Sequence, residues 1–454
     1  MLEPLYSASE MRAAEERYPG YPGSAGELME RAGAAVAQEV LRTYPGARRV
    51  AVVCGGGANG GDGRIAARIL RESGLEVVET DDPGGGGADV VIDALFGTGF
   101  RGAPREEAAA AIGRINATGA PVVSVDIPSG VDATTGEVAG AAVEADVTVT
   151  FHGRKVGLVV APGRFHSGRV VVAGIGLEPA PTALVRGMPA LLDRIPRRGA
   201  RDSKFSAGSL LVVGGAPGTT SAAVLAATGA LRADAGYVTL AVPAAALPVA
   251  ETLALEPVKR GFEWASATEA LQADVARSSA IALGPGLGRS DEARALVRAL
   301  LERADLPAVV DADALFGLAR VDRSAPTVLT PHAGELARLL GVEPAWVSAH
   351  RLEAAAEAAE RFAAVVLLKG PDTIVCAPEG RVIVCDTGPP SLATAGTGDV
   401  LTGVVGAFLA KGVDVVDAAA AAAIAHGLAA RSLPHQAGLI ASDVAAALPG
   451  VLDR

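Results

Sequence analysis

The sequence predicts an α/β protein with two domains, each built around a mainly parallel β-sheet. Short aliphatic runs of strand length alternate with segments of helical spacing, the pattern of strands joined by crossover helices. Glycine is abundant, at 56 residues, and clusters directly after the aliphatic runs, as expected where turns follow strands. The chain has 454 residues, which is long for a single core and favours two domains.

The first series of elements occupies the N-terminal part of the chain. It opens with helical spacing over residues 24–44, and helical spacing recurs over 64–73 and 106–117. The strand-like runs of this series are 50–54, 77–80, 90–93, 122–126, 147–151 and 170–175. The glycine-rich tract at 81–89 predicts a flexible surface loop.

The second series follows a stretch rich in proline and arginine at residues 178–205. Its strand-like runs are 209–213, 237–242, 280–283, 308–311, 327–329, 365–368 and 373–376. Alanine-rich helices are expected around 403–410 and 417–431. We therefore predict two domains, 1–196 and 197–454.

The composition excludes several classes of function. Lysine and arginine total 40 against 51 acidic residues, and this net charge of -11 disfavours binding to a nucleic-acid backbone. The three cysteines form no CxxC pair, which argues against a disulfide scaffold and for a reducing compartment. No signal peptide or membrane span is evident, so we expect a cytoplasmic protein without membrane partners. We also expect a homo-oligomer.

A glycine-rich turn between a strand and a helix is the first candidate binding feature. Gly55, Gly57 and Gly60 satisfy G-x-G-x-x-G, and Glu76 or Glu79 follows at the position of a ribose-binding carboxylate. Glycine lets backbone N–H groups approach a phosphate above a helix N-terminus. No Lys-Ser/Thr follows, which excludes a P-loop. A plain tight turn explains the same pattern equally well.

Two further strand ends carry polar residues. One strand ends on Asp93, and another ends on Asp126 and is followed by Ser129. Ligands of open parallel sheets bind beyond the carboxyl ends of the strands, so these side chains are expected to meet Asn59 and Asp62 in one crevice. For any single carboxylate, a helix cap or an Asx-turn is the simpler explanation. The three strand ends together favour a ligand site.

The N-terminal motifs resemble the NAD(P)HX epimerase family over residues 1–195. The motifs are ELMERAGAAVA, CGGGANGGDG, DALFGTG, VDIPSGVDATTGEV and ADVTVTFHGRKVGLVVAPG, and they occur in the family's order. The resemblance implies a Rossmann-like fold that binds hydrated NAD(P)H. It assigns dinucleotide contacts to Ala58, Asn59, Gly60, Gly61, Asp62, Gly97, Thr98, Gly99, Phe100, Arg101, Gly102, Ala103 and Asp126.

The same resemblance implies a potassium ion held by Asn59, Asp93 and Ser129. The family usually has two asparagines before Gly-Gly-Asp-Gly, and Ala58 replaces the first of them here. Epimerising a carbon that carries a hydroxyl beside a ring nitrogen requires a general acid or base, and we assign that role to Asp126. The ion is expected to orient phosphates or backbone rather than to act as a Lewis acid.

Three features stand out in the C-terminal part. Lys369 and Gly370 end a strand, where a lysine can meet a phosphate. Gly398 and Asp399 open a helix whose N–H groups can stabilise the charge that develops in phosphoryl transfer. His332 follows another strand. Each also has a simpler explanation: Asp399 as a helix N-cap, Lys369 as a solvated lysine and His332 as a turn residue. A further histidine, His426, is more typical of a helix core.

Together these features resemble the ribokinase-like superfamily and, within it, NAD(P)H-hydrate dehydratase over about residues 200–454. The motifs are SKFSAGSLLVVGG, ALGPGLG, VVDADAL, LTPHAGE, LLKGPDT and TAGTGDVLTG. The resemblance assigns ADP or ATP to Lys369, Gly370, Pro371, Asp372, Thr373 and Gly398. It assigns the hydrated nicotinamide to Ala222, Gly286, Gly288, His332 and Asp399.

The resemblance implies a bifunctional repair enzyme. Asp399 would deprotonate the C6 hydroxyl, which attacks the terminal phosphoryl group of the nucleotide, and Mg²⁺ would accompany the phosphates. One alternative is a small-metabolite kinase of the hydroxymethylpyrimidine type, because Gly-x-Gly-Asp fits either. Another is an N-terminal module that binds nucleotides without catalysis.

Overall fold

The computed structural model describes residues 2–320 and 322–453, which fall into two compact units. The N-terminal unit comprises residues 4–184, and the C-terminal unit comprises 185–454 together with the first three residues. The boundary predicted at residues 196 and 197 falls inside the C-terminal unit. Strand β9 (Leu184–Gly187) and the 3₁₀-helix η4 (Pro189–Arg194) precede it, and Leu191 and Leu192 of η4 belong to the C-terminal core.

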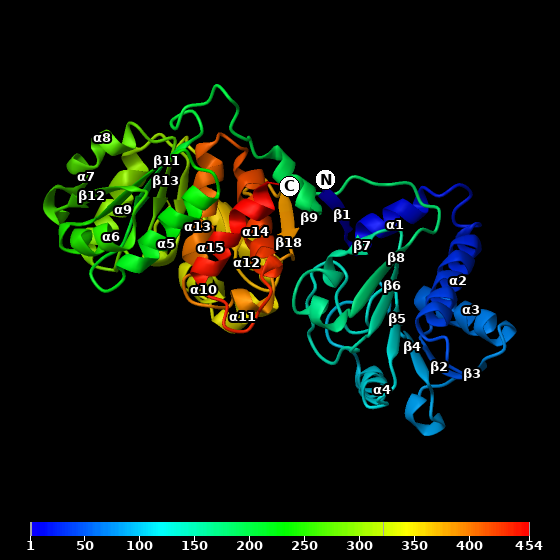
Figure 1. Ribbon diagram of the computed structural model, residues 1–454. Coiled ribbons are helices and arrows are strands. Elements are labelled where there is room, and N and C mark those ends of the chain that lie inside the picture. Colours follow the sequence, from blue (N-terminus) through cyan, green and yellow to red (C-terminus); the bar gives the residue numbers. More distant parts are fainter. Residues whose placement is uncertain (1, 321, 454) are drawn as a thin grey trace. The chain divides into compact units, whose positions relative to one another are not determined.

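The N-terminal unit contains a six-stranded parallel sheet in the order β3-β2-β4-β5-β6-β8 (Figure 1). The strands are β2 (Arg49–Cys54), β3 (Glu76–Glu79), β4 (Val90–Ala94), β5 (Val122–Val125), β6 (Val147–Phe151) and β8 (Arg169–Ala173). All five pairings are parallel, as predicted. Outside this sheet, β1 (Leu2–Tyr6) pairs in parallel with β7 (Arg154–Lys155), and neither strand was predicted.

Helices cover both faces of this sheet, because successive strand residues point to opposite sides. Val50 and Val52 pack under α2 (Ala25–Thr43) and α3 (Ala58–Glu72), whereas Ala51 and Val53 pack under α4 (Glu106–Asn116). The short helix α1 (Ala8–Glu16) precedes them and starts with a capping box at Ser7. The predicted loop at 81–89 contains a short 3₁₀-helix, η1 (Pro83–Gly86). The sheet thus has the two-sided burial of a doubly wound fold.

The C-terminal unit contains a larger sheet in the order β12-β11-β10-β13-β14-β15-β16-β17-β18-β9. Its strands are β10 (Ser209–Val213), β11 (Tyr237–Pro243), β12 (Val258–Phe262), β13 (Ala280–Leu283), β14 (Ala308–Val310), β15 (Thr327–Leu329), β16 (Val365–Leu368), β17 (Thr373–Cys376) and β18 (Val382–Cys385). Strands β12 to β16 pair in parallel, and β16, β17 and β18 form an antiparallel meander. Strands β12 and β18 were not predicted.

Helices surround this larger sheet. They are α5 (Thr220–Arg232), α6 (Leu247–Leu253), α7 (Ala267–Ala270), α8 (Gln272–Val275), α9 (Asp291–Arg303), α10 (Ala333–Leu340), α11 (Pro344–Ala349), α12 (Arg351–Phe362), α13 (Thr397–Ala410), α14 (Val415–Ser432) and α15 (Ala441–Leu452). The two helices predicted at 403–410 and 417–431 are α13 and α14, and both are almost wholly buried.

Glycines allow α13 to pack directly on α5. A Cβ atom at Gly403 would lie 1.9 Å from the carbonyl oxygen of Ala226, and one at Gly229 would lie 2.6 Å from that of Val400. Any larger residue at these positions would separate the two helices. Because α13 carries Asp399, this contact fixes where the start of the helix lies.

Cys54, Cys376 and Cys385 are all free thiols, as the sequence predicted. In the described ranges, every helix is too short or too polar to cross a membrane.

Candidate active sites

The glycine turn of the N-terminal unit lies at the carboxyl end of β2. A Cβ atom at Gly55 would lie 2.0 Å from the carbonyl oxygen of Leu95, and one at Gly60 would lie 2.0 Å from that of Gly55. These glycines therefore permit close contact between the turn and the loop that follows β4. Helix α3 begins at Ala58. The motif thus builds a tight turn and also directs a helix N-terminus toward the sheet edge.

Asp93 at the end of β4 is the centre of a buried hydrogen-bond network. Its carboxylate accepts bonds from the hydroxyl groups of Ser124 (2.8 Å) and Ser129 (2.6 Å) and from the backbone N–H groups of Ser129 (2.9 Å) and Leu95 (3.3 Å). Burial raises the pKa of Asp93, while the bonds from Ser129 and Ser124 act in the opposite direction. Every donor to this carboxylate is a neutral group.

Asn59 reaches the same network through the backbone of Phe96. Its side-chain N–H group donates to the carbonyl oxygen of Phe96 (2.9 Å), while the N–H group of Phe96 donates to Ser129 Oγ (2.9 Å). The amide oxygen of Asn59 faces Gly97, where an added Cβ atom would lie 3.1 Å away. The structure therefore brings Asn59, Asp93 and Ser129 together, as the crevice prediction requires.

Asp126 forms a buried ion pair that the sequence analysis did not predict. Lys155 donates to Asp126 Oδ1 at 2.5 Å, and its side chain is 0% exposed. The Thr150 hydroxyl (3.1 Å) and the Phe151 N–H group (3.3 Å) donate to the same oxygen. Asp126 has a φ of 66°, a left-handed conformation that Asp adopts more readily than most residues. Within the described ranges, all hydrogen bonds to this carboxylate are made to Oδ1.

Asp62 lies beside this pair and has a strongly perturbed acidity. Burial, followed by the negative charges of Asp126 and Glu15, raises the pKa of Asp62 to about 8, and Lys155 offsets only part of this effect. Burial and Asp126 also raise the pKa of Glu15. At neutral pH, Asp62 therefore mostly carries its proton, and it lies next to a carboxylate that is hydrogen-bonded to Lys155. A carboxyl group with such a perturbed pKa beside a second carboxyl group is typical of catalytic sites.

The remaining predicted dinucleotide contacts lie around these groups. Residues 97–103 form an irregular loop after β4, and the ring of Phe100 in this loop stacks on that of the preceding Phe96 at 4.7 Å. Ala58 is exposed, whereas Gly60 is buried beneath the turn. Glu76 and Glu79, the candidates for a ribose carboxylate, form ion pairs with Arg49 and Arg71 at 3.0 and 3.1 Å. The structure thus gives both glutamates another partner.

A lysine–carboxylate pair also lies at the C-terminal site. Lys369 follows β16 and donates to Asp311 Oδ1 at 2.8 Å, while the Thr402 hydroxyl donates to Asp311 Oδ2 at 2.6 Å. Glu335 lies 3.9 Å from the same ammonium. Burial acts to lower the pKa of Lys369, but Asp311 and Glu335 outweigh it, so this pKa is raised. The lysine is therefore a fixed positive charge at the sheet edge.

Asp399 lies in the first turn of α13, beside this lysine. Gly396 caps the helix with a φ of 90°, a conformation that favours glycine. A Cβ atom at Gly398 would lie 3.4 Å from Lys369 Nζ, so the helix N-terminus and the ammonium adjoin one another. Burial and then Asp311 raise the pKa of Asp399 to about 7, against the opposing effect of Lys369. That pKa suits a general base near neutral pH.

His332 has a structural role as well as a predicted one. Its Nδ1 atom accepts from the N–H groups of Gly334 (3.0 Å) and Glu335 (3.4 Å), and the Glu335 carboxylate accepts from the His332 N–H group (2.9 Å). These bonds form a capping box that starts α10. Nε2 of the same ring lies 3.5 Å from Glu335 Oε1, and 58% of the His332 side chain is exposed and can meet a substrate.

The segment 369–373, predicted to bind the nucleotide, contains one residue whose side chain is buried inside the unit. Asp372 is 0% exposed, and Arg351 lies 3.1 Å from its carboxylate and donates to its carbonyl oxygen at 2.7 Å. A Cβ atom at Gly370 would lie 2.4 Å from the Arg351 guanidinium. Arg351 thus supports the segment from the interior of the unit through its contacts with Asp372 and Gly370. The ammonium of Lys369 instead bonds Asp311 at the site.

Two of the predicted substrate residues meet directly. A Cβ atom at Gly286 would lie 3.1 Å from the Cβ atom of Ala222 and 2.3 Å from the carbonyl oxygen of Thr219. The loop after β13 and the start of α5 are therefore in contact at a position that excludes a side chain. The Gly288 N–H group donates to Asp313 Oδ2 at 3.0 Å.

The sequence analysis assigned no role to Lys155, Asp311 or Thr402. Lys155 lies in the motif GRKVG and Asp311 in the motif VVDADAL. The fact that both are charged residues inside family motifs was the signal that could have identified them as site residues. His426, judged a core residue, is buried, and burial lowers its pKa to about 4.

Comparisons with known families cover both units. The family described as NAD(P)H-hydrate dehydratase matches residues 210–449, and the family described as YjeF-related protein N-terminus matches residues 25–80 and 78–157. The chain is also similar to a crystal structure of a ribokinase-like superfamily protein from Enterococcus faecalis. That structure has a TM-score of 0.52 at 21% identity, covering 61% of this chain and 98% of that one. This likeness shows the predicted ribokinase-like fold.

Relatives that match nearly the whole chain are bifunctional enzymes by name. The bifunctional NAD(P)H-hydrate repair enzyme Nnr of Moorella thermoacetica is 40% identical over 94% of this chain and 92% of its own length. The corresponding enzyme of Escherichia coli is 35% identical over 94% and 89%. The ADP/ATP-dependent NAD(P)H-hydrate dehydratase of Bacillus subtilis, co-crystallised with ATP/Mg²⁺, has a TM-score of 0.55 at 31% identity, covering 58% of this chain and 95% of that one. The chain belongs to the family of bifunctional NAD(P)H-hydrate repair enzymes.

Proposed function

We propose that this chain repairs hydrated NADH and NADPH in two steps, using one site in each unit. The N-terminal site epimerises the R and S forms, and the C-terminal site dehydrates the S form with ADP or ATP. The observation that carries the proposal is that family membership over nearly the whole length coincides with two separate clusters of perturbed carboxyl groups. Its partners are small molecules, and a homo-oligomer remains our expectation.

The epimerase site would bind the dinucleotide at the glycine turn, with its phosphates on residues 97–103. Asp62 and Asp126 then adjoin C6 of the hydrated ring. Protonated Asp62 gives its proton to the C6 hydroxyl, so that water leaves as the ring nitrogen forms a double bond to C6. Water adds to the opposite face while Asp126 accepts its proton, and the nitrogen regains its electron pair. Exchange with solvent restores both carboxyl groups.

Lys155 has a positioning role in this scheme. Its ammonium binds Asp126 Oδ1 and holds that carboxylate in place, while Oδ2 stays available to the substrate water. Lys155 therefore contacts Asp126 through a hydrogen bond and acts on the pKa of Asp62 only through its charge.

Potassium fits the network at Asp93. The carboxylate is fully buried and its hydrogen bonds come only from neutral groups, so the described residues supply no positive charge to balance it. Ser129 Oγ bonds this carboxylate, Asn59 joins the same network through the backbone of Phe96, and oxygen is the ligand type that hard cations prefer. Asn59, Asp93 and Ser129 would hold the ion, which would supply a fixed positive charge near the dinucleotide phosphates.

The dehydratase site would activate the C6 hydroxyl as a leaving group. Asp399 takes the hydroxyl proton, and the oxygen attacks the terminal phosphorus, which breaks its bond to ADP or AMP. The N–H groups at the start of α13 and the ammonium of Lys369 stabilise the charge that develops. The C6–O bond then breaks, phosphate leaves with the electron pair, and the C5 proton passes to it, which restores the C5–C6 double bond.

The described residues near Lys369 do not form an evident magnesium site. Asp311 is already bonded to Lys369 and Thr402, and Glu335 closes the capping box of α10. We therefore expect Mg²⁺ to arrive with the nucleotide phosphates, and no step above depends on it.

The test incubates the purified full chain with a mixture of R and S hydrated NADH, ATP and Mg²⁺. Recovery of NADH absorbance from the whole mixture is expected, because the first site converts R to S as the second consumes S. Recovery that stops at the S fraction would contradict the epimerase proposal. A stable phosphorylated product without NADH would contradict dehydration and indicate a kinase.

A further inference from the structure

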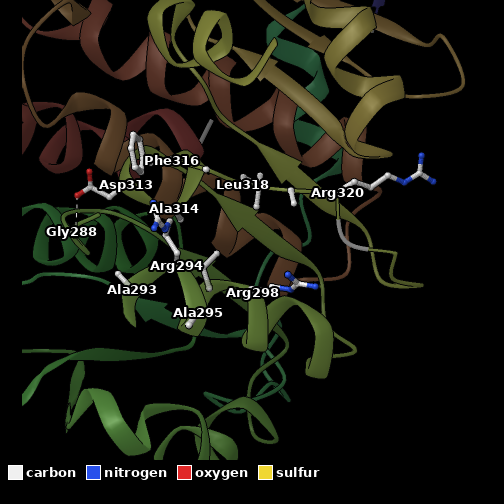
Figure 2. Close-up of a pocket in the computed structure, with 13 residues that line it drawn as sticks. Gly288, Ala293, Arg294, Ala295, Arg298, Asp313, Ala314, Phe316, Leu318 and Arg320 are labelled. Carbon is white, nitrogen blue, oxygen red and sulfur yellow. Dashed lines mark hydrogen bonds between the residues drawn. The ribbon is translucent and has the colours of Figure 1, made fainter. Parts of the chain in front are cut away.

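A cationic pocket lies beside the loop expected to hold the dehydratase substrate. It has a volume of about 330 Å³ and is formed between α9 and the segment that follows β14 (Figure 2). Gly288, an expected substrate contact, is among its lining residues. In the view of Figure 2, Gly288 and Asp313 lie at the left and Arg298 and Arg320 at the right. The pocket thus leads away from the substrate loop.

The lining of this pocket contrasts with the acidic chain around it. Three of its residues are arginines, Arg294, Arg298 and Arg320, and only Asp313 is acidic. Arg294 and Arg298 are one turn apart on α9, about 6 Å along its axis, and the Arg294 head group lies on the Phe316 side of the pocket while that of Arg298 points the other way (Figure 2). The chain carries a net charge of -11, so a local excess of positive charge is a distinctive feature of this surface.

The arginines of this pocket are available to a stronger anion. Arg298 pairs with Glu302 at 2.7 Å and Arg320 pairs with Asp322 at 3.0 Å, and these carboxylates are 48% and 88% exposed. Exposed ion pairs contribute little free energy, whereas a phosphate offers more charge and several acceptor oxygens. A phosphate group can therefore replace these carboxylates.

The pocket also has an aromatic and apolar component. The guanidinium of Arg294 lies 5.9 Å from the centre of the Phe316 ring, and that of Arg289 lies 5.3 Å from it. Such cation–π contacts hold arginine head groups in place. Leu318 and several alanines complete the lining. Apolar walls combined with fixed arginines suit a nucleoside that carries a phosphate.

Asp313 connects this pocket to the reacting groups. It accepts from the Gly288 N–H group at 3.0 Å and from Arg289 at 2.8 Å, and its charge contributes to the raised pKa of Asp399. A dinucleotide with its nicotinamide at Asp399 can therefore extend past Gly288 into the pocket.

We propose that this pocket binds the 2′-phosphorylated adenosine half of hydrated NADPH and favours it over hydrated NADH. The proposal rests on the function proposed for the C-terminal site. Arg298 and Arg320 would contact the 2′-phosphate, which hydrated NADH lacks, while Arg294 and the apolar wall would hold the nucleoside. The pocket would then determine which of the two damaged cofactors is dehydrated more efficiently.

The test measures dehydration of the S forms of hydrated NADPH and hydrated NADH at saturating ATP. In the double variant Arg298→Ala/Arg320→Ala, KM for hydrated NADPH is expected to rise at least about tenfold more than KM for hydrated NADH. The matched control is Arg303→Ala, which removes an exposed arginine of the same helix that pairs with Glu269 and does not line the pocket. It should change neither KM.

Fluorescence titration with NADPH and NADH provides a readout that does not depend on catalysis. The double variant should lose affinity for NADPH selectively, and Arg298→Lys/Arg320→Lys should retain part of it. Equal changes for both cofactors, or no change, would overturn the proposal. If the wild-type chain dehydrated neither substrate, the proposed function would fail, and the titration would still test the pocket.

Discussion

The two sites use the same arrangement of charges with different outcomes. Each has a lysine paired with a carboxylate, Lys155 with Asp126 and Lys369 with Asp311, and as its third group a second carboxyl group whose negative charge is disfavoured by its surroundings. The pKa of the third group is about 8 for Asp62 and about 7 for Asp399. At neutral pH the first holds its proton, whereas a large fraction of the second is ionised. In the proposed mechanism, the same arrangement of charges would supply an acid in one unit and a base in the other.

The two lysines occupy different positions relative to the carboxyl groups of their sites. Lys155 is completely buried and is committed to Asp126 and its neighbours, Thr150 and the Phe151 carbonyl. Lys369 is 20% exposed and adjoins the start of α13, where Asp399 lies. A helix N-terminus also favours negative charge, which assists ionisation of Asp399. At both sites burial is the largest cause of the raised pKa, and the neighbouring lysine opposes it.

The largest expected effect is that of Asp399→Asn. Dehydration should fall about 10²–10⁴-fold, because the amide cannot accept the hydroxyl proton, while epimerisation is retained. The measurement is NADH recovery with ATP alongside chromatographic R-to-S conversion without nucleotide. Equal loss of both activities would show that the two sites are not independent.

Lys155→Met should remove the buried ion pair with Asp126 in the N-terminal unit. The variant leaves Asp126 buried without its partner, so the N-terminal unit is expected to lose about 3 kcal/mol of unfolding free energy. Chemical denaturation followed by a probe in that unit measures the loss. The double variant Lys155→Met/Asp126→Asn should regain stability without regaining epimerisation. If Lys155→Met alone kept full stability, the ion pair would have no structural role.

Asp62→Asn is expected to raise the stability of the chain at high pH while lowering its epimerase activity. Because the folded pKa of Asp62 is raised, its protonated form contributes stability that is present at low pH and is lost as pH rises through about 8. Asparagine does not ionise, so the stability of the variant relative to wild type should rise by several kcal/mol between pH 5 and pH 9, at about 1.4 kcal/mol for each pKa unit of the shift. Epimerisation should fall at both pH values. A stability difference independent of pH would contradict a proton-holding Asp62.

The smallest expected effect is a difference between two pH profiles. The kcat/KM of dehydration should rise through about pH 7 and then level off, because its base Asp399 must be ionised. Epimerisation should decline above about pH 8, because its acid Asp62 must be protonated. Each rate changes by less than about tenfold within one pH unit of its midpoint. Profiles with the same midpoint and direction would contradict the assignment of acid and base.

Much of the fold could be predicted because its signals are local. The strand at residues 209–213 was predicted with its bounds, and the helix at 417–431 nearly so, since aliphatic runs and helical spacing extend over neighbouring residues. Strands β12 and β18 were missed. Strand β12 (Val258–Phe262) contains Lys259, Arg260 and Gly261, and a sequence so poor in apolar residues forms a strand only because β11 pairs with it.

The candidate sites divide in the same way. Asn59, Asp93 and Ser129 follow strand ends, so their meeting at the sheet edge follows from parallel topology. Lys155 is 29 residues from Asp126, and Thr402 is 91 residues from Asp311. No local pattern connects such residues. Asp372 shows the converse, because its place in a nucleotide motif does not reveal that its carboxylate pairs with Arg351 inside the unit.

The sequence by itself determined the α/β class, the two sheets, the glycine turns and the carboxylates at the strand ends. These depend on backbone preferences and on hydrophobic periodicity, which act between near neighbours in the chain. Only the tertiary structure decided which lysine pairs with which carboxylate, and therefore which carboxyl group holds a proton. Burial and charge pairing arise between residues far apart in sequence, and a pKa depends on both.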